Sequence, residues 1–221
     1  MLTRDNIKNG VLQDMIRSGG ASLQILSDAE LEQSWTKTLA DHPEPGADIW
    51  IFGYGSLIWN PAFRFAEKRI GRLCGYHRRF CLWTHLGRGT PDQPGMVLGL
   101  ERGGSCRGLV FRIAAQDVAD EIEIIWRREM VSGAYRPRWT KVEAEEGAVT
   151  AISFIINPVH PRYACKPPEA DIVKSLAHAR GPLGAAREYL DNTVEHLEAL
   201  GICDRNLRRL RRLVSREAGP A

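Results

Sequence analysis

A short apolar run, Ile49-Trp50-Ile51-Phe52, limits the possible folds more than any other segment of the chain. Its β-branched and aromatic residues are uninterrupted by polar ones, which is typical of a strand buried on both faces. Gly53-Tyr54-Gly55-Ser56 follows at once and predicts that the strand ends in a tight turn. The Pro- and Gly-rich segment 42–46 comes just before the run, so we expect the main folded domain to begin at residue 47.

The rest of the chain has strand-like segments in the middle and helical patterns at the end. Gly-containing segments at 102–105 and 145–147 predict two hairpins. Because strands come first and helices last, we expect an α+β fold around a mostly antiparallel sheet or small barrel. The expected strands are 74–84, 96–101, 108–113, 139–143 and 149–156, and the expected helices are 117–130, 168–179, 184–200 and 204–216.

The residues before the first strand have a different pattern. Apolar positions from Ile7 to Ile16 suggest one amphipathic stripe, and Ser27-Asp28-Ala29-Glu30 has the form of a helix N-terminal capping box. We therefore predict a helical N-terminal extension over 1–46 and one domain with C-terminal helices over 47–221. A chain of 221 residues suits one such domain.

Composition excludes several classes of protein. A net charge of +3 is too small an excess to indicate nucleic-acid binding. Charged residues interrupt the N-terminus, which does not resemble a signal peptide, and no apolar run is long enough to span a membrane. The five cysteines are odd in number and form no C-x-x-C pair, which favours a reducing compartment. We expect a cytoplasmic protein with no membrane or nucleic-acid partner.

The loop Gly53-Tyr54-Gly55-Ser56-Leu57 is the first candidate site. Two glycines permit positive φ and clear space, so that successive N–H groups can surround an anion such as a carboxylate. Tyr54 and Ser56 would add hydroxyl groups. The local pattern is equally compatible with a tight turn that binds nothing.

Glu129 is the candidate for proton transfer. Val118, Ile122 and Ile125 form an apolar stripe at helical spacing, and Glu129 continues it by a further step of four. The carboxyl would then face the core, where desolvation raises its pKa toward the range of a useful general base, while Arg127 and Arg128 point away. The alternative is an ordinary helix end, at which the carboxylate reaches solvent or pairs with an arginine.

Two tyrosines and two cysteines complete the candidates. Tyr135 follows Gly133 at the start of a strand, and Tyr189 lies on a helix one turn before Thr193. Each phenol could enter a pocket or simply pack in the core. The histidines lack metal-ligand spacing, so we expect no metal. A hydrolase that uses Cys74 or Cys81 as nucleophile remains open, although no local feature suggests an activated thiolate.

Taken in order, several of these segments resemble the ChaC family of γ-glutamyl cyclotransferases. The resemblance covers roughly residues 48–201, and the segment before Trp50 lies outside it. Trp126-Arg127-Arg128 departs from the longer acidic or aromatic run that many members carry there. The matching pieces are Ile51-Phe52-Gly53-Tyr54-Gly55-Ser56-Leu57-Ile58-Trp59, Gly75-Tyr76-His77-Arg78-Arg79-Phe80, Arg88-Gly89-Thr90 with Pro94-Gly95, Arg128-Glu129-Met130 with Gly133-Ala134-Tyr135-Arg136, and Gly181-Pro182-Leu183-Gly184 with Glu188-Tyr189-Leu190.

This resemblance implies a γ-glutamyl cyclotransferase-like mixed barrel with flanking helices. It also implies cleavage of glutathione to 5-oxoproline and Cys-Gly without a cofactor, with Glu129 as catalytic acid and base. Open alternatives are a cyclotransferase for other γ-glutamyl amines or amino acids, and a non-catalytic binding or regulatory protein on the same scaffold. The expected substrate-binding residues are Gly53, Tyr54, Gly55, Ser56, Leu57, Ile58, Tyr135 and Tyr189.

Overall fold

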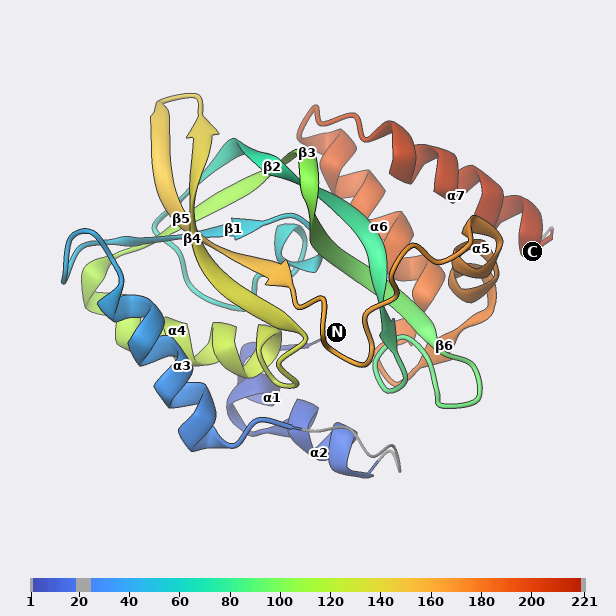
Figure 1. The fold of residues 1–221 in the computed structure, drawn as a ribbon, viewed down its shortest axis with the longest axis horizontal. Coiled ribbons are helices and arrows are strands. Elements are labelled where there is room, and N and C mark those ends of the chain that lie inside the picture. The colour runs from blue at the N-terminus through green and yellow to red at the C-terminus, as the bar shows by residue number, and fades with distance from the viewer. Residues whose placement is uncertain (1, 19–24, 220–221) are drawn as a thin grey trace.

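A computed structural model describes residues 2–18 and 25–219 of the chain. It has a central barrel with helices on two sides (Figure 1). The helices are α1 (Arg4–Lys8), α2 (Val11–Ser18), α3 (Asp28–Ala40), α4 (Val118–Glu129), α5 (Glu169–His178), α6 (Ala186–Ala199) and α7 (Arg205–Glu217), and the short 3-10 helices are η1 (Ser56–Ile58) and η2 (Ala115–Asp117). The strands are β1 (Ile49–Gly53), β2 (Glu67–Thr84), β3 (Gly95–Ile113), β4 (Tyr135–Ala144), β5 (Gly147–Ile156), β6 (Arg180–Gly181) and β7 (Gly184–Ala185).

The five longer strands close into a barrel in the order β1-β3-β2-β4-β5. Strand β1 pairs antiparallel with β3 and parallel with β5, so it has a neighbour on each edge. Ile51 and Phe52 in this strand have no exposed surface. The continuous apolar run is therefore explained by burial on both faces, and the expected α+β barrel is confirmed.

The hairpin predicted at 102–105 is wrong. Residues 95–113 form the single strand β3, which pairs with β2 along nearly its whole length. The register shifts between Cys74 and Tyr76, where Gly75 in β2 faces Gly103 and Gly104 in β3. These three glycines all have positive φ. They form a bulge that bends the two-stranded ribbon, whereas a hairpin would reverse the chain.

Helices α1, α3 and α4 lie together on one side of the barrel (Figure 1). The capping box at Ser27 is confirmed, because its hydroxyl accepts from the Glu30 backbone N–H and the Glu30 carboxylate accepts from the Ser27 N–H. Arg4 in α1 forms a bidentate ion pair with the buried Glu121 of α4. Ile7 is fully buried in the common core. The described part of the N-terminal segment is thus packed against α4 and the common core, and the division of 1–46 from 47–221 stays a prediction.

Helices α5, α6 and α7 gather at the other side of the molecule (Figure 1). All three lie within two or three residues of the predicted ranges, and Gly201, with φ +69, follows α6 as expected. Helix α6 packs against β3 and η1, which brings Tyr189 to the loop after β1. Within the described residues, no helix combines the length and apolar character needed to cross a bilayer.

Candidate active site

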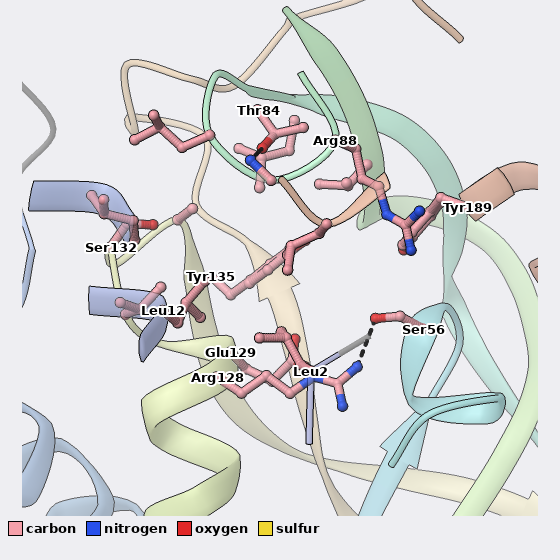
Figure 2. Close-up of a pocket in the computed structure, with 18 of the residues that line it drawn as sticks. Leu2, Leu12, Ser56, Thr84, Arg88, Arg128, Glu129, Ser132, Tyr135 and Tyr189 are labelled. Carbon is pink, nitrogen blue, oxygen red and sulfur yellow. Dashed lines mark hydrogen bonds and ion pairs between the residues drawn. The ribbon is translucent and has the colours of Figure 1, made fainter. Parts of the chain in front are cut away.

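A cavity of about 190 Å³ opens between the end of α4, the loop after β1, and the N-terminal helices (Figure 2). The N-terminal segment provides an apolar wall through Leu2, Leu12 and Ile16. The polar and aromatic lining comes from Ser56, Trp59, Asn60, Thr84, Arg88, Arg128, Glu129, Ser132, Tyr135, Arg162 and Tyr189.

Glu129 is the carboxylate of this cavity. It is the last residue of α4, and only 14% of its side chain is exposed. The stripe that predicted its direction is buried, since Ile122 and Ile125 are 1% and 0% exposed. Burial raises the pKa of Glu129, and the neighbouring Arg128 partly opposes that rise. A carboxyl with a raised pKa that lines a cavity is suited to accept and return a proton at neutral pH.

Arg128 does not point away from the core, contrary to the sequence-based expectation. Its side chain is 6% exposed, and its Nε lies 2.9 Å from Glu129 Oε1. Its terminal nitrogens donate to the Ser56 hydroxyl, at 2.9 Å, and to the backbone carbonyls of Asn60 and Pro61. The reason is a contact between segments that are distant in sequence, because the loop after β1 presents these oxygen acceptors to the end of α4. Arg128 thereby ties the catalytic candidate to the glycine loop.

The predicted role of the loop glycines needs correction. Neither Gly53 nor Gly55 has a positive φ, and the η1 helix begins right after Gly55. Both are needed for space. A methyl group on Gly53 would lie 2.9 Å from the Phe111 ring, and one on Gly55 would lie 2.8 Å from the Tyr189 hydroxyl. Of the predicted loop residues, only Ser56 lines the cavity.

Tyr54, Leu57 and Ile58 are buried in the core, outside the cavity lining. The Tyr54 hydroxyl donates to the carbonyl of Phe154 at 2.9 Å. Burial raises the pKa of Tyr54 well above its usual value, so the phenol stays neutral. Tyr54 therefore supports the loop from the core side, and its hydroxyl already donates its hydrogen bond to the Phe154 carbonyl.

Tyr135 and Tyr189 do reach the cavity (Figure 2). The Tyr135 hydroxyl donates to the Leu98 carbonyl at 2.7 Å. Tyr189 is 7% exposed and packs edge-on against Trp59 and Phe80. Burial raises the pKa of Tyr189 to about 12 and the pKa of Tyr135 well above its usual value. Both are neutral phenols beside Glu129.

Sequence reasoning did not select Leu2, Leu12, Ile16 or Arg162 as site residues, yet all four line the cavity. The first three belong to the predicted N-terminal extension, and an amphipathic stripe does not indicate which surface it packs against. Arg162 lies in an irregular segment after β5 that carries no periodic signal. Arg88, which was part of the family pattern, also lines the cavity and pairs with Glu188 at 3.1 Å.

The cysteines considered as nucleophiles lie outside this cavity. Cys81 is fully buried, and burial raises the pKa of its thiol to about 12, so the thiolate is scarce at neutral pH. Cys74 is exposed on β2. Within residues 2–18 and 25–219, no group of three or more His, Cys, Asp and Glu side chains is placed to hold a metal ion.

Comparison with known sequences identifies related proteins. A family model described as "ChaC-like protein" matches residues 49–217. A glutathione-specific gamma-glutamylcyclotransferase of Escherichia coli K12 is 39% identical over 208 residues, covering 94% of this chain and 89% of the relative. Glutathione-specific gamma-glutamylcyclotransferase 1 of Homo sapiens is 30% identical over 158 residues, covering 69% and 71%.

A solved structure has the same fold. The selenomethionine-labelled glutathione-specific γ-glutamyl cyclotransferase from yeast superposes with a TM-score of 0.72 at 20% identity, covering 78% of this chain and 97% of that one. The two structures therefore share the fold of the barrel with its flanking helices.

Proposed function

The chain belongs to the family of ChaC-like proteins, and we propose that it is a glutathione-specific γ-glutamylcyclotransferase, which converts glutathione to 5-oxo-L-proline and Cys-Gly in the cytoplasm. The observation that carries this proposal is the largely buried carboxyl of Glu129, which lines a cavity whose described lining contains no cysteine. A reaction whose substrate supplies its own nucleophile fits such a site.

Glutathione carries that nucleophile as its α-amine. The amine attacks the γ-carbonyl carbon, a C–N bond closes the five-membered ring, and the bond to the cysteine nitrogen breaks. Holding the chain in the folded-back conformation can supply a large part of the rate enhancement, about 7–11 kcal/mol at the limit. The enzyme therefore has to orient the substrate and to move protons.

Glu129 is placed for the proton transfers. The α-nitrogen enters as an ammonium and ends as a lactam N–H, so it loses two protons, while the departing nitrogen gains two and leaves as an ammonium. We assign Glu129 as the base that takes protons from the α-nitrogen and as the acid that returns them to the leaving nitrogen. Its raised pKa favours both roles, because it makes the carboxylate a stronger base and lets the carboxyl keep the proton until the leaving nitrogen takes it.

The γ-glutamyl part of the substrate would lie at the Ser56 end of the cavity. Ser56 and Arg128 provide polar groups beside Glu129, and the ring of Tyr189 closes that end. The Gly53–Ile58 loop acts here mainly by shape, because its glycines let Tyr189 and Phe111 approach the backbone. The neutral phenol of Tyr189 can donate a hydrogen bond without adding charge near Glu129, whereas the Tyr135 hydroxyl already donates to the Leu98 carbonyl.

The test is to incubate the purified protein with reduced glutathione and to measure 5-oxoproline and Cys-Gly, with Glu129→Gln in parallel. We expect equimolar products from the wild type and a kcat lower by roughly 10²–10⁴ in the variant, because the amide keeps the shape and removes the base. Glu123→Gln, the same change on the same helix but outside the cavity lining, serves as a folded control. Turnover of other γ-glutamyl amides but not of glutathione would move the substrate assignment to those compounds. A protein that binds glutathione without converting it would contradict the proposed activity.

A further inference from the structure

Three arginines line the cavity, and one of them differs from the others. Arg88 pairs with Glu188 at 3.1 Å, and Arg128 pairs with Glu129 at 2.9 Å. Among the described residues, Arg162 forms no ion pair with an acidic side chain. One of its terminal nitrogens donates to the Ser132 hydroxyl, while its buried Nε has no hydrogen-bond acceptor.

The groups around Arg162 leave its charge uncompensated. Burial raises the pKa of Tyr135 well above its usual value, so this neighbour is a neutral phenol. Burial lowers the pKa of His85 and of His160, with Arg162 acting in the same direction. A partly buried guanidinium with a free N–H and no counter-charge among the described residues is costly unless an anion binds to it.

Arg162 lies away from the Ser56 end of the cavity. Its partner Ser132 is separated from Ser56 and Tyr189 in Figure 2, with Tyr135 between them. Leu12 of the N-terminal wall lies on the same side as Ser132. The cavity therefore has one polar end beside Glu129 and, on the side of Ser132 and Leu12, a second end that Arg162 lines.

We propose that Arg162 binds the terminal carboxylate of the dipeptide that leaves, and that this second end of the cavity is the Cys-Gly subsite. The inference rests on the proposed function, which puts the γ-glutamyl part at Ser56 and the scissile bond at Glu129. A two-residue peptide reaches at most about 7 Å in extended form, so its carboxylate stays within about that distance of the scissile bond. Arg162 offers a charge-assisted hydrogen bond at this end of the cavity, and Leu12 provides apolar surface for the cysteine side chain.

Such a subsite selects for the free terminal carboxylate of the tripeptide. A γ-glutamyl amine has no carboxylate at that place, and γ-glutamylcysteine carries one that is a residue too short. An ester on the glycine keeps the length and removes the charge. Glutathione and its glycyl ethyl ester are therefore the matched pair of substrates.

The experiment compares kcat and KM for these two substrates in the wild type, Arg162→Met and Arg162→Lys. In Arg162→Met we expect kcat/KM for glutathione to fall by roughly 10- to 100-fold, mainly through KM, which is the range of a hydrogen bond to a charged group. The ester should lose far less, and Arg162→Lys should restore part of the preference. Equal losses on both substrates would mean that Arg162 only supports the fold, and would overturn the proposal.

Ser132→Ala is the control for a structural role, because it removes a hydrogen-bond partner of Arg162 and leaves the cation in place. We expect it to keep the preference for glutathione over the ester. Calorimetric binding of the two compounds to Glu129→Gln, with and without Arg162→Met, gives the same comparison without turnover. An inactive wild type that still binds glutathione more tightly than the ester through Arg162 would refute the proposed reaction alone, and equal affinities for the two compounds would refute the subsite.

Discussion

Replacing Gly55 with alanine tests whether the loop glycine is present to make room for Tyr189. The added methyl carbon would lie 2.8 Å from the Tyr189 hydroxyl, closer than carbon and oxygen can approach. The next nearest atoms both belong to Leu98, at 3.5 and 3.7 Å, which are ordinary contacts. The clash is thus with one oxygen atom.

The size of the effect follows from how firmly that oxygen is held. The Tyr189 ring is 7% exposed and fixed between Trp59 and Phe80, with ring centroids 6.0 Å from each. It cannot swing aside cheaply, so we expect Gly55→Ala to lower the free energy of unfolding by about 1–3 kcal/mol, the usual cost of overpacking. Tyr189→Phe removes the clashing atom and alone should cost only the hydroxyl's hydrogen bonding, about 0.5–1.5 kcal/mol.

The assay is a double-mutant cycle measured by urea unfolding. Any backbone cost of alanine at residue 55 is the same with Tyr189 and with Phe at position 189, so it cancels in the cycle. The free energy of unfolding of the double variant should therefore be about 1–3 kcal/mol higher than the sum of the two single effects predicts. Gly53→Ala is the matched control, because its methyl would meet Phe111 and Leu57, and its cost should simply add to that of Tyr189→Phe. Additivity within about 0.5 kcal/mol for the Gly55 pair would refute the steric reasoning.

Three further predictions concern the chemistry. The pKa of Glu129 is raised and the base must be ionised, so kcat/KM should fall as the pH drops through a value above the ordinary glutamate range. This decrease at low pH should be missing from the pH profile of the residual rate of Glu129→Gln. An unchanged decrease would assign the titration to another group. Tyr54→Phe should lower the unfolding free energy by about 1 kcal/mol, because it leaves the Phe154 carbonyl without its donor. It should leave kcat and KM as they are, and a large kinetic effect would contradict the placement of its hydroxyl. Treating the protein with iodoacetamide, and removing the reagent before glutathione is added, should leave 5-oxoproline formation intact, because burial raises the pKa of Cys81 to about 12 and the exposed Cys74 lies outside the cavity; inactivation would support the thiol-hydrolase alternative.

The sequence predicted those features that rest on local periodicity. The stripe ending at Glu129 gave the direction of the carboxyl, and the apolar run before Gly53 gave the central strand. Sequence-based prediction failed for features that depend on contacts between segments distant in the chain. Glycines at 103 and 104 form a bulge only because Gly75 faces them in the neighbouring strand. Arg128 turns inward because the loop after β1 offers oxygen acceptors, and no pattern within α4 contains that information.

The pairing of Arg128 with Glu129 bears on why a buried carboxyl can serve in both directions of proton transfer. Burial alone would favour the neutral acid, which could not accept a proton from the α-nitrogen. A fully solvated ion pair would keep the group as a weakly basic carboxylate, which would seldom carry the proton that the leaving nitrogen needs. At this site the two effects oppose each other on one group, with burial the larger. Arg128 is also bonded to Ser56 and to the carbonyls of Asn60 and Pro61, so the loop after β1 holds the guanidinium in contact with Glu129 and thereby sets how strongly it opposes the effect of burial.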